Sequence, residues 1–160
     1  KWLFDLKAKQ IEVVVHPQSI VHSAVQFEDG SIKAQLGVPS MEIPIQYALT
    51  YPNHIKSNCK KLDLVELKTL NFEEPDFEKF RCIKLAYQAI EKGGSCPVVL
   101  NVANDILVDN FLNDRINFLD IPNIIEEVLD QHESIQDLTL DDINYLTNWT
   151  KQYMKEKING

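Results

Sequence analysis

The first fifty residues alternate apolar and polar positions in the way that is typical of β-strands. Ile11–His16 is an apolar, β-branched run and predicts a strand that ends at the following proline. Ile20–Phe27 predicts a second strand, and Ser31–Leu36 predicts a strand that returns beside it. Asp29-Gly30 lies between them and is the dipeptide of a two-residue hairpin turn. We therefore expect a small β-sheet unit at the start of the chain.

The period of two also assigns side chains to the two faces of this sheet. We expect one face to be polar, formed by alternate residues of the second strand, by two residues across the hairpin and by two neighbours: Ile20, His22, Ala24, Gln26, Lys33, Gln35, Glu12 and His16. A polar face can be solvated, can line a pocket or can meet a partner chain, and the pattern leaves all three open.

The pattern changes after the sheet unit. Residues 42–51 predict a short helix with Pro44 in its first turn. Residues 52–75 lack helical periodicity and predict a linker with an extended piece near Leu67–Phe72. Residues 76–160 have the spacing of amphipathic helices throughout. The chain therefore predicts an α+β fold, in which a small mixed or antiparallel β-sheet unit and a linker precede a four-helix C-terminal bundle.

Capping residues suggest where these helices begin and end. We expect Asp76 to cap a helix that ends at Gly93-Gly94. A second helix is predicted from Val98 to Asn113, a third from Asp120, and a fourth from a capping box at Thr139–Asp142. Residues 1–8 look like the tail of another helix. The predicted domain organisation is residues 1–51, a linker over residues 52–75, and a helical domain over residues 76–160.

The composition of the chain argues against several classes of function. The net charge is −8 and the pI is about 4.9, which argues against a nucleic-acid-binding surface. No apolar run is long enough to cross a bilayer, so no membrane partner is expected. The cysteines, Cys59, Cys82 and Cys96, match neither a zinc pattern nor a disulfide framework, and reduced thiols are the simplest interpretation.

The candidate chemical residues form no complete motif. His16 and His22 are six residues apart with a proline between them, which does not match a helical metal-binding pair. Ser19 and Ser23 lack the sequence context of a catalytic serine. The segment 37–41, GVPSM, lacks phosphate-loop spacing. The residues by themselves therefore predict neither a catalytic group nor a metal site, and structural roles for both histidines stay open.

Three polar residues in the LNVANDIL segment share one side of a predicted helix. Asn101, Asn104 and Asp105 lie three and four residues apart. They can pin helices together or cap a neighbouring helix, and they can equally support a site.

One long, irregular string carries a family resemblance. VHPQSIVHSAVQFEDGSIKAQLGVPSM resembles the catalytic-domain sheet of the 1-deoxy-D-xylulose 5-phosphate reductoisomerases, and the resemblance continues through IPIQYALTYP, KKLDLVELKTLNF, FRCIKLAYQAIEKGG and LNVANDILVDNFL. It covers nearly the whole chain. The resemblance implies that the chain is the C-terminal part of such an enzyme. Residues 1–51 would then be the end of the catalytic domain, and the nucleotide-binding domain, the metal-binding carboxylates and the phosphate loop would precede Lys1. The absence of an initiator methionine agrees with this expectation.

The resemblance also implies an activity. The parent enzyme would convert 1-deoxy-D-xylulose 5-phosphate, a sugar phosphate, to 2-C-methyl-D-erythritol 4-phosphate in isoprenoid synthesis. It would use NADPH and Mg²⁺ or Mn²⁺, which would be bound mainly by the missing N-terminal part. It would be a homodimer formed through the β-sheet domain, in the bacterial cytoplasm or in a plastid-type organelle. This chain alone would be inactive, with no catalytic residue and no metal ligand of its own.

The implied site residues fall into two groups. Those expected to form the wall of the substrate and cofactor pocket are Ser19, His22, Pro39 and Met41, and those expected to support the site are His16, Asn101, Asn104 and Asp105. A different class of function also fits the residues, namely a non-catalytic interaction module in which a β unit and an acidic helical bundle dock a protein partner.

Overall fold

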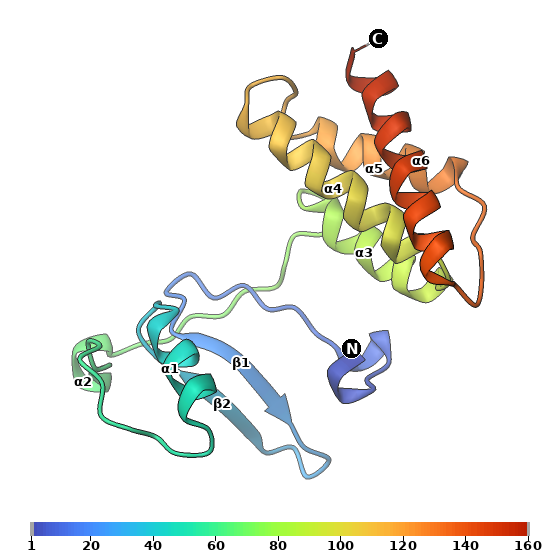
Figure 1. Ribbon diagram of the computed structural model, residues 1–160. Coiled ribbons are helices and arrows are strands. Elements are labelled where there is room, and N and C mark those ends of the chain that lie inside the picture. The colour runs from blue at the N-terminus through green and yellow to red at the C-terminus, as the bar shows by residue number, and fades with distance from the viewer. Residues whose placement is uncertain (1, 160) are drawn as a thin grey trace. The chain divides into compact units, whose positions relative to one another are not determined.

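The computed structural model describes residues 2–159, which form two compact units (Figure 1). Residues 13–75 form the hairpin unit, and residues 2–12 with residues 76–159 form the helical unit. The strands and helices are β1 (Val21–Gln26), β2 (Ile32–Leu36), α1 (Glu42–Thr50), α2 (Leu64–Leu67), α3 (Arg81–Lys92), α4 (Cys96–Leu112), α5 (Asp120–Gln131) and α6 (Leu140–Asn159), with 3₁₀ turns at Trp2–Phe4 and Ala8–Gln10. The predicted α+β class is confirmed.

β1 and β2 form an antiparallel hairpin, with Ala24 opposite Ala34. The turn between them is stabilised by Asp29, whose carboxylate accepts hydrogen bonds from the Ser31 backbone N–H at 2.9 Å and from the Ser31 hydroxyl at 2.6 Å. Gly30 has a φ of +82°, a left-handed conformation that glycine adopts without strain. The predicted hairpin is therefore confirmed at the residues that signalled it.

The predicted polar face is wrong because the hairpin loop is longer than predicted. Phe27 and Ser31 close the loop, since the Phe27 N–H donates to the Ser31 carbonyl oxygen at 2.9 Å. The loop thus has three residues, Glu28 to Gly30, and one extra loop residue shifts the strand register by one position. Lys33 consequently lies opposite Val25, and not on the face of Ala24.

The predicted strand Ile11–His16 is also largely wrong. Within the described chain its only β-partner is Glu73, which exchanges backbone hydrogen bonds with Val15 at 2.9 and 3.0 Å. The piece near Leu67–Phe72 is predicted to be extended, but its first residue, Leu67, is the last residue of the short helix α2. The Asp63 side chain caps the first turn of this helix. A β-branched run becomes a strand only where another strand lies alongside it, and its own sequence cannot supply that neighbour.

The predicted linker folds back on α1. The Gln46 side chain donates to the Ile55 carbonyl oxygen at 3.1 Å, and the Tyr47 ring stacks on His54 with 4.5 Å between ring centroids. The predicted helix over residues 42–51 is confirmed as α1. The division into residues 1–51, 52–75 and 76–160 stays a prediction, while the contacts group residues 13–75 together.

The hairpin unit buries very little apolar surface. Of its large apolar side chains only Ile20 is buried, at 8% exposure. Val25 is 58% exposed, Ile32 63% and Met41 69%. Because a two-stranded hairpin is marginally stable in water, we expect this unit to be the less stable of the two by itself.

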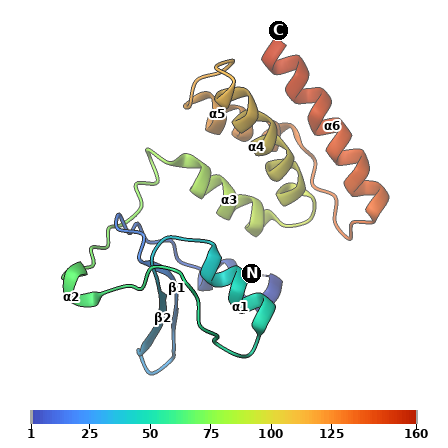
Figure 2. The same cartoon turned by 60° about the vertical axis from the view of Figure 1, so that its left-hand side comes forward.

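The helical unit contains the hydrophobic core. α4 packs against α3, α5 and α6 (Figures 1 and 2), which confirms the predicted bundle. Core side chains come from all four helices: Leu85, Ala89, Cys96, Val99, Ala103, Leu107, Ile121, Ile125, Val128, Leu129, Leu146 and Met154.

Two of the predicted helix boundaries are confirmed. α3 ends at Gly93, whose φ is +71°. The predicted capping box precedes α6: the Thr139 hydroxyl accepts from the Asp142 N–H at 3.2 Å, and the Asp142 carboxylate accepts from the Thr139 N–H at 2.9 Å. An aspartate can therefore take the position that glutamate usually occupies in this motif.

Other boundaries differ from the predictions. Asp76 does cap a turn, through the Lys79 N–H at 2.9 Å, but α3 begins only at Arg81. Asp120 lies in the first turn of α5, and its carboxylate accepts from the backbone N–H of Asn117, which precedes the helix. α4 begins at Cys96 and not at Val98, and the predicted helix tail over residues 1–8 is limited to 3₁₀ turns in the described residues. Short polar side chains cap turns as well as helices, so they do not fix the exact boundary.

One core position predicts a stabilising substitution. Thr150 is fully buried in α6, and its hydroxyl has no hydrogen-bond partner among the described residues. Thr150→Val should raise the free energy of unfolding by about 1 kcal/mol, because it removes an unsatisfied buried hydroxyl without changing the side-chain shape. Urea unfolding followed by circular dichroism measures this difference.

Thr147 offers the matched control, because its hydroxyl donates to the Ile143 carbonyl oxygen at 2.8 Å in the same helix. Thr147→Val should lower the free energy of unfolding by about 0.5 to 1 kcal/mol. Equal effects of the two substitutions would contradict this interpretation.

Candidate functional site

A β-bulge in β1 sets the position of His22. The strand register shifts between Val21, which lies opposite Leu36, and Ser23, which lies opposite Gln35. His22 is therefore the extra residue of the bulge. Bulges are frequent beside active sites, where they redirect one side chain out of the regular alternation. The exposed His22 imidazole is thus placed by the backbone of β1 and not by burial.

Gly37 lies beside His22 and begins the loop that leads into α1. It is buried, and its N–H donates to the Ile20 carbonyl oxygen at 3.0 Å. A Cβ at Gly37 would lie 3.8 Å from His22 Cε1 and 4.0 Å from Ile43 Cδ1. The predictions missed Gly37 as part of this site, although a glycine at the end of a strand pattern often marks such a close approach.

The Gly37–Met41 loop presents two of the predicted pocket residues to its surroundings. Pro39 is exposed, and Met41 is 69% exposed and directly precedes α1. The Ser40 hydroxyl accepts from the Glu42 N–H at 3.2 Å and so stabilises the entry into the helix. An exposed, flexible thioether can pack against a flat ring, which is the chemistry predicted for this loop.

His16 connects two distant segments of the hairpin unit. Its Nδ1 lies 2.7 Å from the Asn71 carbonyl oxygen, and its ring stacks on Phe72 with 4.7 Å between centroids. Because a carbonyl oxygen only accepts, Nδ1 carries the proton and donates. The buried Nε2 atom then has a free lone pair and no partner among the described residues. His16 thus joins the segment that precedes β1 to residues 71 and 72.

Ser19 lies in the turn between His16 and β1. Its φ is +51°, a left-handed conformation that is uncommon for serine and occurs most often at functional sites. Its N–H donates to the His16 carbonyl oxygen at 3.0 Å, whereas its hydroxyl has no hydrogen-bond partner among residues 2–159. The hydroxyl is exposed and can donate to, or accept from, a group outside this chain.

The polar group of α4 lies in the helical unit. Asn101 and Asp105 are exposed and Asn104 is partly buried. Within the described part of the chain none of the three side chains forms a hydrogen bond, so none of them pins two helices together there. A role of these residues in supporting a site stays a prediction.

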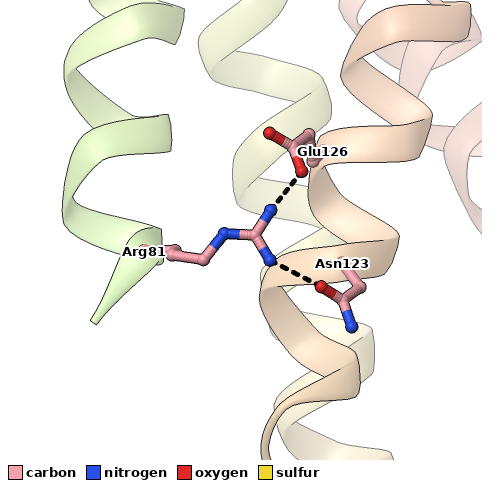
Figure 3. Close-up of polar contacts among 3 residues, drawn as sticks. All are labelled: Arg81, Asn123 and Glu126. Carbon is pink, nitrogen blue, oxygen red and sulfur yellow. Dashed lines mark hydrogen bonds and ion pairs between the residues drawn. The ribbon is translucent and has the colours of Figure 1, made fainter. Parts of the chain in front are cut away.

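Arg81 forms the most elaborate polar contact between bundle helices (Figure 3). One guanidinium nitrogen is paired with the Glu126 carboxylate, and another donates to Asn123 Oδ1 at 2.6 Å. A small cavity of about 90 Å³ borders this group. Because the Arg81 charge is already neutralised by Glu126, the contact is a link between α3 and α5 and not an anion-binding site.

Among residues 2–159, no three histidine, cysteine, aspartate or glutamate side chains are grouped closely enough to hold a metal ion. The residues present therefore do not fit a divalent metal site. None of the helices described here combines the length and the apolar character needed to cross a membrane.

Comparison with known proteins identifies the class. An α+β chain with a bulged hairpin, an exposed loop and a C-terminal helical bundle matches solved reductoisomerase structures. One match is the 1-deoxy-D-xylulose 5-phosphate reductoisomerase from Zymomonas mobilis in complex with NADPH. The match covers 99% of this chain, with a TM-score of 0.90 and 37% sequence identity. A second match, at 42% identity and a TM-score of 0.89, is a DOX-P reductoisomerase in complex with NADPH, fosmidomycin and magnesium.

Sequence comparison defines the family. The family model for the DXP reductoisomerase C-terminal domain matches residues 36–153. Relatives named 1-deoxy-D-xylulose 5-phosphate reductoisomerase are 52% identical over 99% of this chain in Clostridium perfringens and 51% identical over 98% in Chloroherpeton thalassium. The chain belongs to the DXP reductoisomerase C-terminal domain family. It spans 41% of the length of each of these two relatives, and 42% and 41% of the two solved chains.

Proposed function

We propose that this chain is the C-terminal part of an NADPH-dependent reductoisomerase that converts 1-deoxy-D-xylulose 5-phosphate to 2-C-methyl-D-erythritol 4-phosphate in isoprenoid synthesis. The observation that supports this most is the match over 99% of the chain, at 52% identity, to a relative of that name. The structural match to an NADPH complex supports it independently.

In this proposal the chain alone is inactive. The described residues hold no group of three metal-ligating side chains, so in this proposal none of them binds the metal. NADPH and Mg²⁺ or Mn²⁺ would be bound mainly by the part of the parent protein outside this chain. One of the matched structures is a complex with NADPH, and another is a complex with NADPH, fosmidomycin and magnesium. The chain would contribute part of the pocket wall.

The proposed pocket wall consists of Ser19, His22, Pro39 and Met41, all in the hairpin unit. His22 is directed by the bulge, and the free hydroxyl of Ser19 belongs to a residue with left-handed backbone, so both polar groups are held by backbone geometry. Met41 would provide an apolar contact for a planar ring. These groups orient and enclose a ligand, and none of them is proposed as the acid or base of the reaction.

The proposed supporting residues act one step further away. His16 would position Ser19, through the hydrogen bond from the Ser19 N–H to the His16 carbonyl oxygen. Asn101, Asn104 and Asp105 would present a polar helix surface to the remainder of the enzyme.

We further propose a homodimer formed through the β-sheet domain. The hairpin unit exposes Val25 and Ile32 on opposite faces of its sheet, and a sheet with exposed apolar faces and unpaired edges is a suitable surface for further strands. The bacterial relatives support a location in the bacterial cytoplasm.

Reconstitution tests the proposed activity. This chain, mixed with the N-terminal part of a reductoisomerase relative, should oxidise NADPH when the sugar phosphate and Mg²⁺ are added, whereas each part alone should not. The decrease in NADPH absorbance measures the rate. A reconstituted pair that co-elutes and is folded but shows no turnover would contradict the proposal and would favour the non-catalytic interaction module.

Variants of β1 connect the activity to the pocket wall. In the reconstituted pair His22→Gln should lower kcat/KM by roughly 10- to 100-fold, the range seen when a group that positions a site is removed. Gln26→Ala is the control, because Gln26 is exposed on the same strand away from the bulge. A normal rate for His22→Gln would remove His22 from the site without affecting the family assignment.

A further inference from the structure

The four bundle helices converge on one buried serine–histidine pair. The Ser95 Oγ atom lies 2.6 Å from His132 Nε2, with Ser95 fully buried and His132 only 7% exposed. Ser95 directly precedes α4 and His132 directly follows α5. Gly93 at the end of α3 is two residues away from Ser95, and the Trp149 ring of α6 lies 5.5 Å from the His132 ring.

Backbone hydrogen bonds surround this pair. The Ile135 N–H donates to Ser95 Oγ at 2.8 Å, and the Ser95 N–H donates to the Ile135 carbonyl oxygen at 2.9 Å. The Ser134 hydroxyl donates to the Gly93 carbonyl oxygen at 3.3 Å. We call residues 93–95 and 132–135, joined in this way, the clasp.

The contacts define the protonation state of the clasp. Ser95 Oγ already accepts from Ile135, and among the described residues His132 Nε2 is the only acceptor in reach of its hydroxyl proton. The serine hydroxyl proton therefore has a partner only when Nε2 is the unprotonated nitrogen of a neutral imidazole and accepts from Ser95. Protonation of Nε2 would make Ser95 Oγ accept from both Ile135 and His132, would leave the serine hydroxyl proton without a partner among the described residues, and would introduce a buried charge.

The surroundings of the imidazole oppose protonation. Burial lowers the pKa of His132 below its ordinary value of 6.5, the positive charge of Lys92 at the end of α3 lowers it further, and Glu133 opposes the shift. The imidazole meets the Ser95 hydroxyl just before α4 and the Trp149 indole of α6, and neither of these groups titrates near pH 6.5.

We propose that the clasp is a proton-sensitive link, which holds the four helices together while His132 is neutral and releases them when the imidazole is protonated. It would act on α4, the helix that bears Asn101, Asn104 and Asp105. The proposal goes beyond the proposed function and does not depend on it, because its readout is the stability of the bundle.

The direction of the pH effect follows from linkage. Well above pH 6.5 the histidine is neutral in both the folded and the unfolded chain, so it contributes no pH dependence there. Below that value the unfolded chain binds a proton that the folded chain does not. The unfolding equilibrium constant should therefore rise by about tenfold for each pH unit, until the folded-state pKa is reached.

The first test is a titration of the full 160-residue chain followed by the imidazole resonances in NMR spectra. His132 should titrate below pH 6.5 and should have an unprotonated Nε2 in the neutral form. Titration of His132 at or above 6.5, or a proton on Nε2 in the neutral form, would overturn the proposal.

The second test compares the free energy of unfolding in urea at about pH 7.5 with that at about pH 5.5. This range of roughly two pH units spans the ordinary pKa of histidine, below which the shift changes stability. Wild type should lose stability on acidification, and His132→Gln should lose markedly less, whatever its stability at pH 7.5. His54→Gln is the control, since His54 is exposed in the hairpin unit, and it should retain the wild-type slope. Equal slopes for wild type and His132→Gln would overturn the proposal.

Discussion

Gly94→Ala is expected to destabilise the helical bundle by about 2 to 5 kcal/mol, the sum of a left-handed backbone penalty and of overpacking. Gly94 has a φ of +51°, and an added Cβ would clash with the carbonyl oxygen of Ile135 and lie 2.7 Å from Ser134 Oγ. Because the clash is partly with backbone, it cannot be relieved by rotating a side chain. The midpoint of urea unfolding, followed by circular dichroism at helical wavelengths, measures the loss.

The adjacent glycine separates strain from clash. Gly93 has a φ of +71°, but a Cβ there would meet no atom within 4 Å. Gly93→Ala should therefore cost only the backbone penalty, about 1 to 2 kcal/mol. Gly37→Ala should cost less than about 1 kcal/mol, because the added Cβ would have ordinary contacts of 3.7 to 4.0 Å. If Gly94→Ala were no more damaging than Gly93→Ala, the close contact at the clasp would be refuted.

Hydrogen exchange should differ sharply between the two units of the chain. In the chain alone, amides of β1 and β2 should be protected by no more than about tenfold, because the hairpin unit has one buried apolar side chain, Ile20. Amides of α4, which packs against three other helices, should be protected by on the order of 10³-fold or more. Exchange followed by NMR or mass spectrometry measures both.

The N-terminal part of a reductoisomerase relative provides the control for this experiment. Its addition should raise protection in β1 and β2 and leave α4 nearly unchanged, since α4 is already packed in the helical unit. Strands that are protected as strongly as α4 in the chain alone would show that the hairpin unit is stable without further contacts. The reasoning from its low burial would then be wrong.

The helical half was predicted better than the β half for a physical reason. Helix hydrogen bonds are local, so periodic apolar residues and the capping box at Thr139 are sufficient to locate α6. Strand hydrogen bonds join distant residues. Val15 has the composition of a strand residue but pairs only with Glu73, a partner that no local pattern identifies.

The candidate site shows the same limit. His22, Pro39 and Met41 could be selected from the sequence only through the resemblance, because no motif marks them. The bulge at His22 is a shift of strand register at the end of the hairpin away from the loop, and no local sequence pattern marks it. Whether these residues form the pocket wall stays a prediction.

By itself the sequence determined the α+β class, the hairpin at Asp29-Gly30, the helical bundle and the family, since each depends on residues close together or on a long string of matched positions. Only the tertiary structure showed that the β2 side chains lie on the sheet faces opposite to the predicted ones. Only the tertiary structure, too, showed the buried pair of Ser95 and His132, which are 37 residues apart. Such contacts depend on how elements pack, and packing is a property of distances in space that the order of residues along the chain does not state.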